Sequence, residues 1–279
     1  MTPRQTLGIL HPGSMGAAVA GCAAANGHRV LWSPAGRSPA TEARAQQHGL
    51  EAAPLEQLLV DADVLLSLCP PAAAVGVADQ VAEIGYAGVF VDANAISPAS
   101  VGRISAALPA SAVLVDAAVV GSPPVGGKTP TLYLAGPAAA TELVELLFAG
   151  TAVRTHLLGV EPGQASALKL AYSSFQKASR VLAALAIGLA HEHGVDQELA
   201  AIAGRRSGSY LAETEYIPKT AARAWRWGPE LEEAAAMLAD AGLPPDMLTA
   251  AAATLARWDD AKDAAQLSVA EALARLSTP

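Results

Sequence analysis

The first 26 residues restrict the fold of this chain more than any other stretch. A short apolar run at 6–10 leads into Gly8-Ile-Leu-His-Pro-Gly13-Ser-Met-Gly16, and an alanine-rich helical segment follows at 17–26. Glycines in a strand-to-helix turn allow a tight bend, a close approach of backbone to a pyrophosphate, and close packing of helix on strand. Gly13 and Gly16 hold the second and third glycine positions of that pattern, and His11 stands at the first. We therefore expect a strand, a phosphate-binding turn and a helix in direct succession.

The turn supplies the candidate cofactor contacts. Proline fixes its own φ, so Pro12 stiffens the backbone beside His11, and a helix that starts near Ser14 offers its N-terminal amides to an anion. The residues expected to contact the pyrophosphate of a dinucleotide are His11, Pro12, Gly13, Ser14 and Met15. The alternative interpretation is a tight turn without a ligand.

The end of the second expected strand, at 29–32, indicates which dinucleotide is bound. Sites that select NAD carry an acid here for the ribose hydroxyls, whereas this chain has Ser33-Pro-Ala-Gly-Arg37-Ser38 and no acid before Glu42. Hydroxyl and guanidinium groups suit a 2′-phosphate, because arginine binds phosphate oxygens through a fork of donors. We predict NADP (NADPH), bound by Ser33, Arg37 and Ser38. The alternative is that Arg37 is a solvated loop charge.

The two halves of the chain differ in pattern. Apolar runs at 63–68, 89–92, 113–116 and 131–135 and a helical segment at 41–48 predict an α/β domain with a doubly wound, mainly parallel sheet. After residue 164 nearly everything is helical, at 165–193, 197–203, 229–241, 245–258 and 261–276. A helix over 165–193 would be about 43 Å long, which suits a link between domains. We place the domains at 1–160 and 161–279.

Composition excludes several classes of protein. Hydrophobic residues make up 52% of the chain and charged residues 16%, which is not the composition of a disordered chain. The net charge of −8 opposes a nucleic-acid surface, because such a surface needs a basic stripe. Cys22 and Cys69 show no metal-ligand spacing, and neither a signal peptide nor a long apolar segment is evident. We predict a cytoplasmic protein without a metal site or a membrane span.

Several motifs together resemble the β-hydroxyacid dehydrogenase and 6-phosphogluconate dehydrogenase superfamily, to which imine reductases are related. Besides the opening turn they are Leu68-Cys-Pro-Pro71, Asp92-Ala-Asn94-Ala-Ile-Ser97-Pro98, Asp116-Ala-Ala-Val-Val-Gly121-Ser122-Pro123-Pro124 and Gly163-Gln-Ala-Ser-Ala-Leu-Lys169. The His11-Pro12 variant and the tryptophan-rich tail are similar to a bacterial subgroup with its own C-terminal domain. The resemblance implies a Rossmann domain, a long interdomain helix and an all-α C-terminal domain. It also implies a homodimer formed through the C-terminal helices.

The resemblance assigns further cofactor contacts. Cys69 and Pro70 would lie in the loop that passes over the cofactor, and Asn94 and Ser97 would flank the nicotinamide. Asn94 and Ser97 also follow an expected strand, at the sheet edge where α/β proteins bind ligands. For Ser97 an equally good interpretation is a helix N-cap, because Pro98 follows it in the first helical position.

The substrate loop departs from the family. Val120 stands where the family carries its substrate-loop serine, with Ser122 two residues further on. We predict that Ser122 and Asn94 contact the substrate; the alternative for Ser122 is a rigid turn. A second departure is Ser173, which stands where the family has an asparagine one turn after its catalytic lysine.

Hydride transfer to a carbonyl needs a proton donor near the forming alkoxide. Lys169 matches the family's catalytic lysine, and an apolar environment would lower its pKa. Ser166, Lys169, Tyr172 and Ser173 are spaced to share one helix face. We predict Lys169 as general acid/base, Tyr172 as a second proton donor and Ser173 as a positioning hydroxyl. The alternatives are that Lys169 snorkels from an apolar helix, or that Lys177 takes its role.

We therefore predict an NADPH-dependent oxidoreductase that reduces a small carbonyl or keto-acid substrate. The alternatives are an imine reductase and a non-catalytic NADPH-binding protein.

Overall fold

The computed structural model describes residues 4–205, 208, 210, 213–262, 264 and 266–277. The chain forms two compact units, Met1–Ser174 and Phe175–Pro279. Their division lies within helix α7 (Gln164–Glu192), because the first turns of α7 are hydrogen-bonded to a strand of the first unit. The domain limits that we predicted, 1–160 and 161–279, stay a prediction.

One sheet organises the first unit. In the described part of the chain it contains β1 (Thr6–Ile9), β2 (Arg29–Trp32), β3 (Glu51–Ala52), β4 (Val64–Ser67), β5 (Val89–Asp92), β6 (Val113–Val120), β7 (Thr131–Ala135) and β8 (Arg154–Gly159). The strand order is β3-β2-β1-β4-β5-β6-β7-β8. Only the β6–β7 pair of these is antiparallel. The predicted doubly wound, mainly parallel sheet is therefore confirmed.

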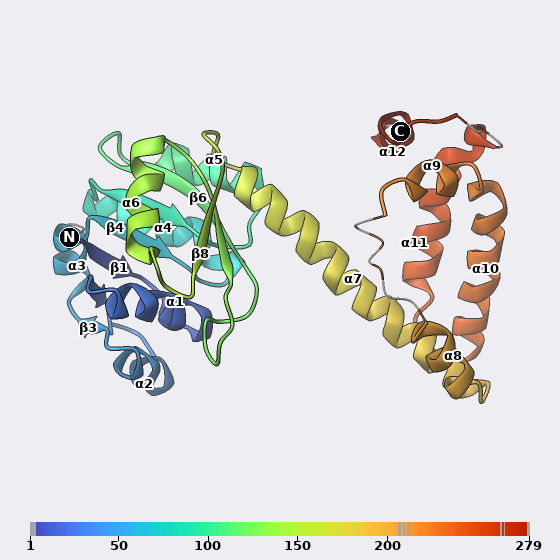
Figure 1. Ribbon diagram of the computed structural model, residues 1–279, viewed down its shortest axis with the longest axis horizontal. Helices are drawn as coiled ribbons and strands as arrows, with labels where there is room; N and C mark the ends of the chain where they lie inside the picture. The colour runs from blue at the N-terminus through green and yellow to red at the C-terminus, as the bar shows by residue number, and fades with distance from the viewer. Residues whose placement is uncertain are drawn as a thin grey trace. The chain divides into compact units, whose positions relative to one another are not determined.

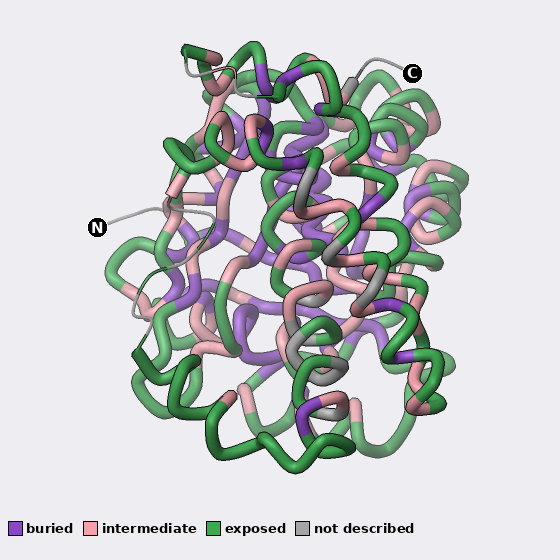
Figure 2. The backbone as a smooth tube through the Cα atoms, turned by 90° about the vertical axis from the view of Figure 1, so that its right-hand side faces the viewer, coloured by how far each residue is buried: buried purple, intermediate pink, exposed green. Residues whose placement is uncertain are grey.

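Helices cover both faces of this sheet (Figure 1). One face carries α1 (Ser14–Ala25), α2 (Pro39–Gln47) and α6 (Ala138–Phe148), and the other carries α3 (Leu55–Asp61), the 3₁₀ helix η1 (Pro71–Ala73), α4 (Ala74–Ile84) and α5 (Pro98–Ala107). The strands are short apolar runs because both of their faces are buried. Figure 2 shows the buried backbone following the strands. Alanines such as Ala20 and Ala23 are fully buried, so α1 lies close to the sheet behind the glycine turn.

The second unit consists of helices. After the C-terminal part of α7 come α8 (Asp196–Ala203), α9 (Tyr216–Ala221), α10 (Ala224–Asp240), α11 (Asp246–Leu255), the 3₁₀ helix η3 (Ala256–Ala261) and α12 (Val269–Ser277). The predicted all-helical character of this region is confirmed. In the described residues no helix combines the length and the apolar character that crossing a membrane requires.

The structure corrects several helix boundaries in this unit. α9 was not predicted, and α11 ends at Leu255, although we expected that helix to continue to residue 258. We expected a helix to begin at Pro229, but α10 begins at Ala224 and contains Pro229. Pro229 is the sixth residue of α10, and without an N–H it cannot donate the backbone hydrogen bond that the helix would otherwise have there. We also expected one helix over 261–276, but α12 begins only after Ser268. The Ser268 hydroxyl accepts a hydrogen bond from the Glu271 backbone N–H, and the Glu271 carboxylate accepts one from the Ser268 N–H. This reciprocal pair caps the helix and sets its start.

The structure also adds elements in the first unit that we did not predict: α3, η1, α4, α6, β3 and β8. It contains α5, the helix that the capping interpretation of Ser97 requires. The expected strand at 113–116 is longer, since β6 continues to Val120. That extension carries the chain past the end of β5, and it brings Val119 and Val120 to the edge where the site lies.

Candidate functional site: a dinucleotide pocket at the sheet edge

The candidate site lies where parallel strands end. β1, β2, β4, β5 and β6 run in the same direction, so their carboxyl ends share one edge of the sheet. Helix α1 begins at Ser14 directly after the turn that follows β1. Its N-cap residue is Gly13, which has no side chain to occupy the first amides of the helix. These amides and the positive end of the helix dipole can therefore serve an anion.

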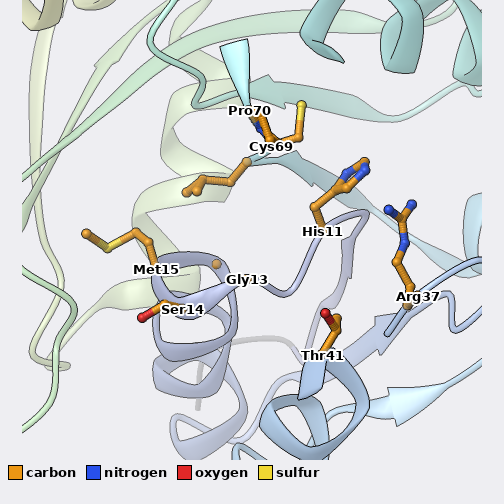
Figure 3. Close-up of a pocket in the computed structure, with 10 residues that line it drawn as sticks. His11, Gly13, Ser14, Met15, Arg37, Thr41, Cys69 and Pro70 are labelled. Atoms are coloured by element: carbon orange, nitrogen blue, oxygen red, sulfur yellow. The ribbon is translucent and has the colours of Figure 1, made fainter. Parts of the chain in front are cut away.

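A pocket of about 310 Å³ opens at this turn (Figure 3). Its wall combines the turn after β1, the segment after β2 and the loop after β4. The lining residues are His11, Gly13, Ser14, Met15, Gly16, Arg37, Thr41, Leu68, Cys69 and Pro70. The structure thus brings together most of the cofactor residues predicted from three separate motifs. Gly16, Thr41 and Leu68 also line the pocket, although we had not assigned them as contacts.

The two glycines of the turn have different tasks. A Cβ at Gly16 would lie 2.6 Å from the backbone oxygen of His11. Only glycine therefore lets α1 approach the end of β1. A Cβ at Gly13 would meet nothing within 4 Å. The protein itself does not require glycine there, so the space in front of Gly13 remains for a ligand.

His11 contributes an uncharged imidazole to the pocket. Burial, and to a lesser extent the positive Arg37, lower the pKa of His11 to about 4, so the side chain is neutral at pH 7. Its Nδ1 atom is buried without a hydrogen-bond partner among the described residues. Figure 3 shows His11 and Arg37 projecting to the same side of the turn. An unpaired buried nitrogen beside a guanidinium fits a ligand that carries phosphate oxygens.

The segment after β2 forms the second side of the site. Ser33 is buried, whereas Arg37 and Ser38 are exposed. The Ser38 hydroxyl caps α2 by accepting a hydrogen bond from the Thr41 N–H at 3.3 Å. Leu10, His11, Ser33, Ala35, Arg37, Leu55, Val77 and Gln80 line a smaller hollow of about 80 Å³. Ser33 and Arg37 therefore lie beside the turn, as predicted, and Ser38 has a structural partner of its own.

Arg44 is a residue that the sequence analysis missed. Its guanidinium donates to the Thr41 hydroxyl at 3.0 Å, and its Nε lies 3.5 Å from the backbone oxygen of Pro12. It thus connects α2 to the phosphate turn. The sequence does hold a signal for the first contact, since residues three apart on a helix are neighbours. The contact with Pro12 depends on how α2 packs.

The residues after β5 have structural roles. Asn94 is only 2% exposed, and its amide is hydrogen-bonded to Ser67, Cys69 and Asp92. The Ser97 hydroxyl accepts a hydrogen bond from the Ser100 N–H at 3.2 Å, so Ser97 is the N-cap of α5. The capping interpretation of Ser97 is confirmed.

Asp116 of β6 binds the start of α7. Its carboxylate accepts hydrogen bonds from the N–H groups of Gly163 (2.7 Å) and Ser166 (3.0 Å) and from the Ser166 hydroxyl (2.6 Å). Asp116 is fully buried, and a carboxylate at a helix N-terminus is favoured by the helix dipole. We had quoted Asp116 within a motif without giving it a task. Its contacts determine where α7 begins.

Lys169 lies one turn beyond this anchor. Its Nζ donates to the backbone oxygen of Val119 at 2.7 Å, near the end of β6. Ser166 is fully buried, Lys169 is half-buried and Ser173 is 8% exposed, whereas Tyr172 is 40% exposed. The predicted shared face therefore holds for Ser166, Lys169 and Ser173, and Tyr172 lies at its margin.

The remaining predicted residues are Ser122 and Lys177. Ser122 is exposed in the loop between β6 and β7, beyond the half-buried Val120. The side chain of Lys177 lies outside the described residues. Among those residues, no group of three or more His, Cys, Asp and Glu side chains has an arrangement that could hold a metal ion.

A glycine turn, an open helix N-terminus and a parallel sheet edge define a dinucleotide-binding protein. Residues 6–159 match the family model described as the NAD binding domain of 6-phosphogluconate dehydrogenase. The chain belongs to this family, which makes it an NAD(P)-dependent oxidoreductase. Residues 190–258 match a domain of unknown function, DUF1932. The predicted superfamily, the separate C-terminal domain and the dinucleotide cofactor are confirmed.

Solved structures share the fold over 92–98% of this chain. A conserved protein of unknown function, described as similar in structure to 3-hydroxyacid dehydrogenases, is 26% identical, with a TM-score of 0.60 and coverage of 92% of this chain and 97% of that one. An imine reductase from Pseudomonas sp. is 18% identical, with a TM-score of 0.72 and coverage of 98% and 100%. A reductive aminase from Aspergillus terreus, in complex with NADPH and ethyl levulinate, is 16% identical, with a TM-score of 0.72 and coverage of 98% and 99%. No curated protein matches the chain.

Proposed function

We propose that the protein is an NADPH-dependent reductase of a small carbonyl or keto-acid substrate, with Lys169 as general acid/base. The observation that carries this proposal is the hydrogen bond from Lys169 Nζ to the backbone oxygen of Val119. It holds the ammonium group near the end of β6, on the sheet edge that also carries the dinucleotide pocket. A proton donor is needed there when a carbonyl oxygen becomes an alkoxide.

Preference for NADP rests on charge and hydroxyl groups beside the turn. Arg37 and Thr41 line the pocket, and no acidic side chain is among its lining residues. A 2′-phosphate would meet the guanidinium of Arg37 and the neutral imidazole of His11. The reductive aminase with the same fold is known in complex with NADPH, which supports the same assignment.

The chain's own groups have distinct tasks in the proposed reaction. When bound, NADPH supplies the hydride. The amides at the start of α1 hold the pyrophosphate, and Gly13 leaves the space for it. The ammonium of Lys169 has three N–H donors. The Val119 carbonyl takes one of them and so orients the group, which then gives a proton to the substrate oxygen and recovers it from water. Tyr172 and Ser173 follow within the next turn, where they would contact the substrate together with Ser122.

Imine reduction is the second candidate. An imine is protonated on nitrogen before it accepts hydride, so it needs an acid more than an oxyanion site. Tyr172 lies three residues after Lys169 on α7 and is 40% exposed. Its hydroxyl suits the protonation of an imine nitrogen. The imine reductase and the reductive aminase that share the fold support this alternative.

The test is NADPH oxidation, followed by nicotinamide absorbance, with a panel of 3-keto acids, aldehydes and cyclic imines. We expect turnover with keto acids; turnover with imines alone would establish the second candidate, and none with any substrate would contradict both. In the same assay Arg37→Ala should raise KM for NADPH about tenfold or more and change KM for NADH little. Equal changes for the two cofactors would contradict the assignment of Arg37.

We further propose a homodimer formed through the C-terminal helices. Several large apolar side chains of the second unit are exposed, including Ile187 (58%), Ile202 (65%) and Met237 (44%). Apolar side chains that gather on one surface are typical of interfaces, so we infer that these side chains face the partner chain. Light scattering should give twice the monomer mass, and a monomer would contradict the proposal.

A further inference from the structure

The loop after β4 forms one wall of the dinucleotide pocket. Leu68, Cys69 and Pro70 line the pocket and connect β4 to η1 without regular structure. Such a loop needs contacts from elsewhere to keep one conformation. The backbone oxygen of Ser67 accepts a hydrogen bond from the Ala93 N–H at 2.9 Å, which joins the ends of β4 and β5. Beyond that point the Cys69 N–H of the loop donates to the Asn94 side chain, and the Pro70 backbone oxygen accepts from the Ala73 N–H at the start of the next helix.

The Asn94 side chain connects three separate groups. Its Oδ1 accepts a hydrogen bond from the Cys69 N–H at 2.6 Å, and its Nδ2 donates to Asp92 Oδ2 at 2.8 Å and to Ser67 Oγ at 3.1 Å. The Asn94 N–H in turn donates to Asp92 Oδ1 at 3.1 Å. The partners determine the orientation of the amide. In the reversed orientation two donors would face each other at Cys69 and two acceptors at Asp92.

These contacts do not leave the amide available to a ligand. Asn94 is 2% exposed, and Asp92 and Ser67 are fully buried. An amide is also the side chain that this place requires. It supplies an acceptor for Cys69 together with two donors for Asp92 and Ser67, which neither a serine nor an ionised carboxylate can do.

We propose that Asn94 is a positioning residue, whose buried amide fixes the Leu68–Pro70 loop in the conformation that receives the dinucleotide. This rests on the proposed dinucleotide function of the pocket. It replaces the prediction that Asn94 touches cofactor or substrate. Asn94 acts through Cys69, and the loop touches the cofactor.

The charged and titratable groups around this amide make the idea testable by pH. Asp92 lies directly against Asn94, and Asp116 is its neighbour in the register of β5 and β6. The Cys69 thiol is close to Asp92, and burial raises its pKa. Burial and the negative Asp116 raise the pKa of Asp92 to about 6 against two opposing hydrogen bonds from Asn94. A second carboxyl at position 94 would share a proton with Asp92 as the pH falls.

The experiment measures the dissociation constant for NADPH of the full chain by cofactor fluorescence between pH 5 and 8. The dissociation constant of each variant is divided by that of the unchanged protein at the same pH. Hydrogen–deuterium exchange of the segment around Cys69 is measured in the protein without cofactor. Asn94→Ala should weaken NADPH binding about tenfold or more at every pH and speed exchange in the loop.

Asn94→Asp should bind NADPH as poorly as Asn94→Ala at pH 8 and should recover most of the lost NADPH affinity at pH 5. There the protonated carboxyl again accepts from Cys69 and donates to Asp92. This variant also provides the test if Asn94→Ala does not fold. The matched control is Thr141→Val. Thr141 is 1% exposed, and its hydroxyl bonds only to Pro137 and Ala138 among the described residues.

Three results would overturn the proposal. Hydrogen exchange of the loop could be unchanged in Asn94→Ala. The NADPH affinity of Asn94→Ala could change no more than that of Thr141→Val, or the NADPH affinity of Asn94→Asp could fail to recover at pH 5. Failure of the unchanged protein to bind NADPH would instead refute the proposed cofactor. Hydrogen–deuterium exchange of the loop would then still test whether Asn94 fixes its conformation, because it is measured without cofactor.

Discussion

The two units of this chain are stabilised differently. In the first unit, large side chains such as Phe90, Leu65 and Ile9 are completely buried on both faces of the sheet. In the second unit, one buried cluster consists of Ala221, Ala224, Trp258, Ala261 and Ala272. Alanine buries little apolar area, so such a cluster contributes little hydrophobic stabilisation for each residue.

The difference bears on function. The first unit has a core large enough to hold loops and strand ends in fixed positions, and its polar groups are arranged around a pocket. The second unit leaves apolar side chains exposed, and among its described residues Leu238 and Trp258 are the large apolar side chains that are buried. We infer that the first unit carries the cofactor chemistry, while the second gains stability from a partner chain. Four experiments test this contrast.

The largest effect is expected from Trp258→Ala. Trp258 is 7% exposed, and its indole N–H donates to the Ala272 backbone oxygen at 2.8 Å. Truncating a buried tryptophan costs about 3–5 kcal/mol. Urea unfolding should show that loss in the transition of the second unit, with NADPH affinity unchanged. Trp225→Ala is the control, because Trp225 is 44% exposed with Lys262 above its ring. Equal losses of unfolding free energy in Trp258→Ala and Trp225→Ala would contradict the proposed role of Trp258 in the core of the second unit.

Lys169→Met tests the catalytic side of the contrast. It removes the proposed proton donor, so kcat should fall at least 100-fold, or about 2.7 kcal/mol in the barrier. NADPH affinity, measured by fluorescence, should remain. Lys128→Met provides the control, since Lys128 is an exposed lysine in the loop between β6 and β7. Near-normal turnover of Lys169→Met would transfer the role to Tyr172.

The two glycines of the turn separate binding from packing. At Gly16 a new Cβ collides with the His11 backbone oxygen, and overpacking of this kind costs about 1–3 kcal/mol. Gly16→Ala should therefore lower both the melting temperature and NADPH affinity. At Gly13 the Cβ meets only open space, so Gly13→Ala should keep its melting temperature and lose NADPH affinity. If Gly13→Ala bound NADPH normally, the pyrophosphate would not lie over this turn.

The last test concerns Asp92. Its pKa of about 6 lies above the ordinary value of about 3.8 for an aspartate, so the folded protein holds this proton more tightly than the unfolded chain does. The contribution to stability is complete below pH 4 and is lost as the pH rises through 6, with a slope of at most about 1.4 kcal/mol per pH unit.

Asp92→Asn should remove that part of the pH dependence in the first unit. Urea titrations between pH 4 and 7 measure it, with the exposed Asp79→Asn as control. An unchanged difference between pH 4 and 7 would mean that Asp92 is ionised throughout this range.

Local patterns in the sequence were sufficient for much of the fold and the pocket. The strands at Arg29–Trp32 and Val89–Asp92 follow directly from apolar runs. The helix cap at Ser97 follows from the proline after that serine, whereas the cap at Ser38 was not predicted. The pocket residues His11 and Arg37 were predicted from the ends of strands, because parallel strands deliver their loops to one edge; Cys69 was predicted only from the family resemblance. In each case the determining interactions lie within a few residues.

The contacts that join distant segments were not predictable in this way. Asn94 carries the same amide whether it faces a ligand or a buried neighbour, and only the packing of β4 against β5 places Ser67 and Cys69 beside it. Arg44 reaches Pro12 because α2 packs beside the turn, and Asp116 meets Ser166 across 50 residues. The amino-acid order thus determined the cofactor class and the edge that binds it, because short-range geometry carries that information. The tertiary structure decided which polar groups remain open to a ligand, because burial and hydrogen-bond partners depend on segments far apart in the chain.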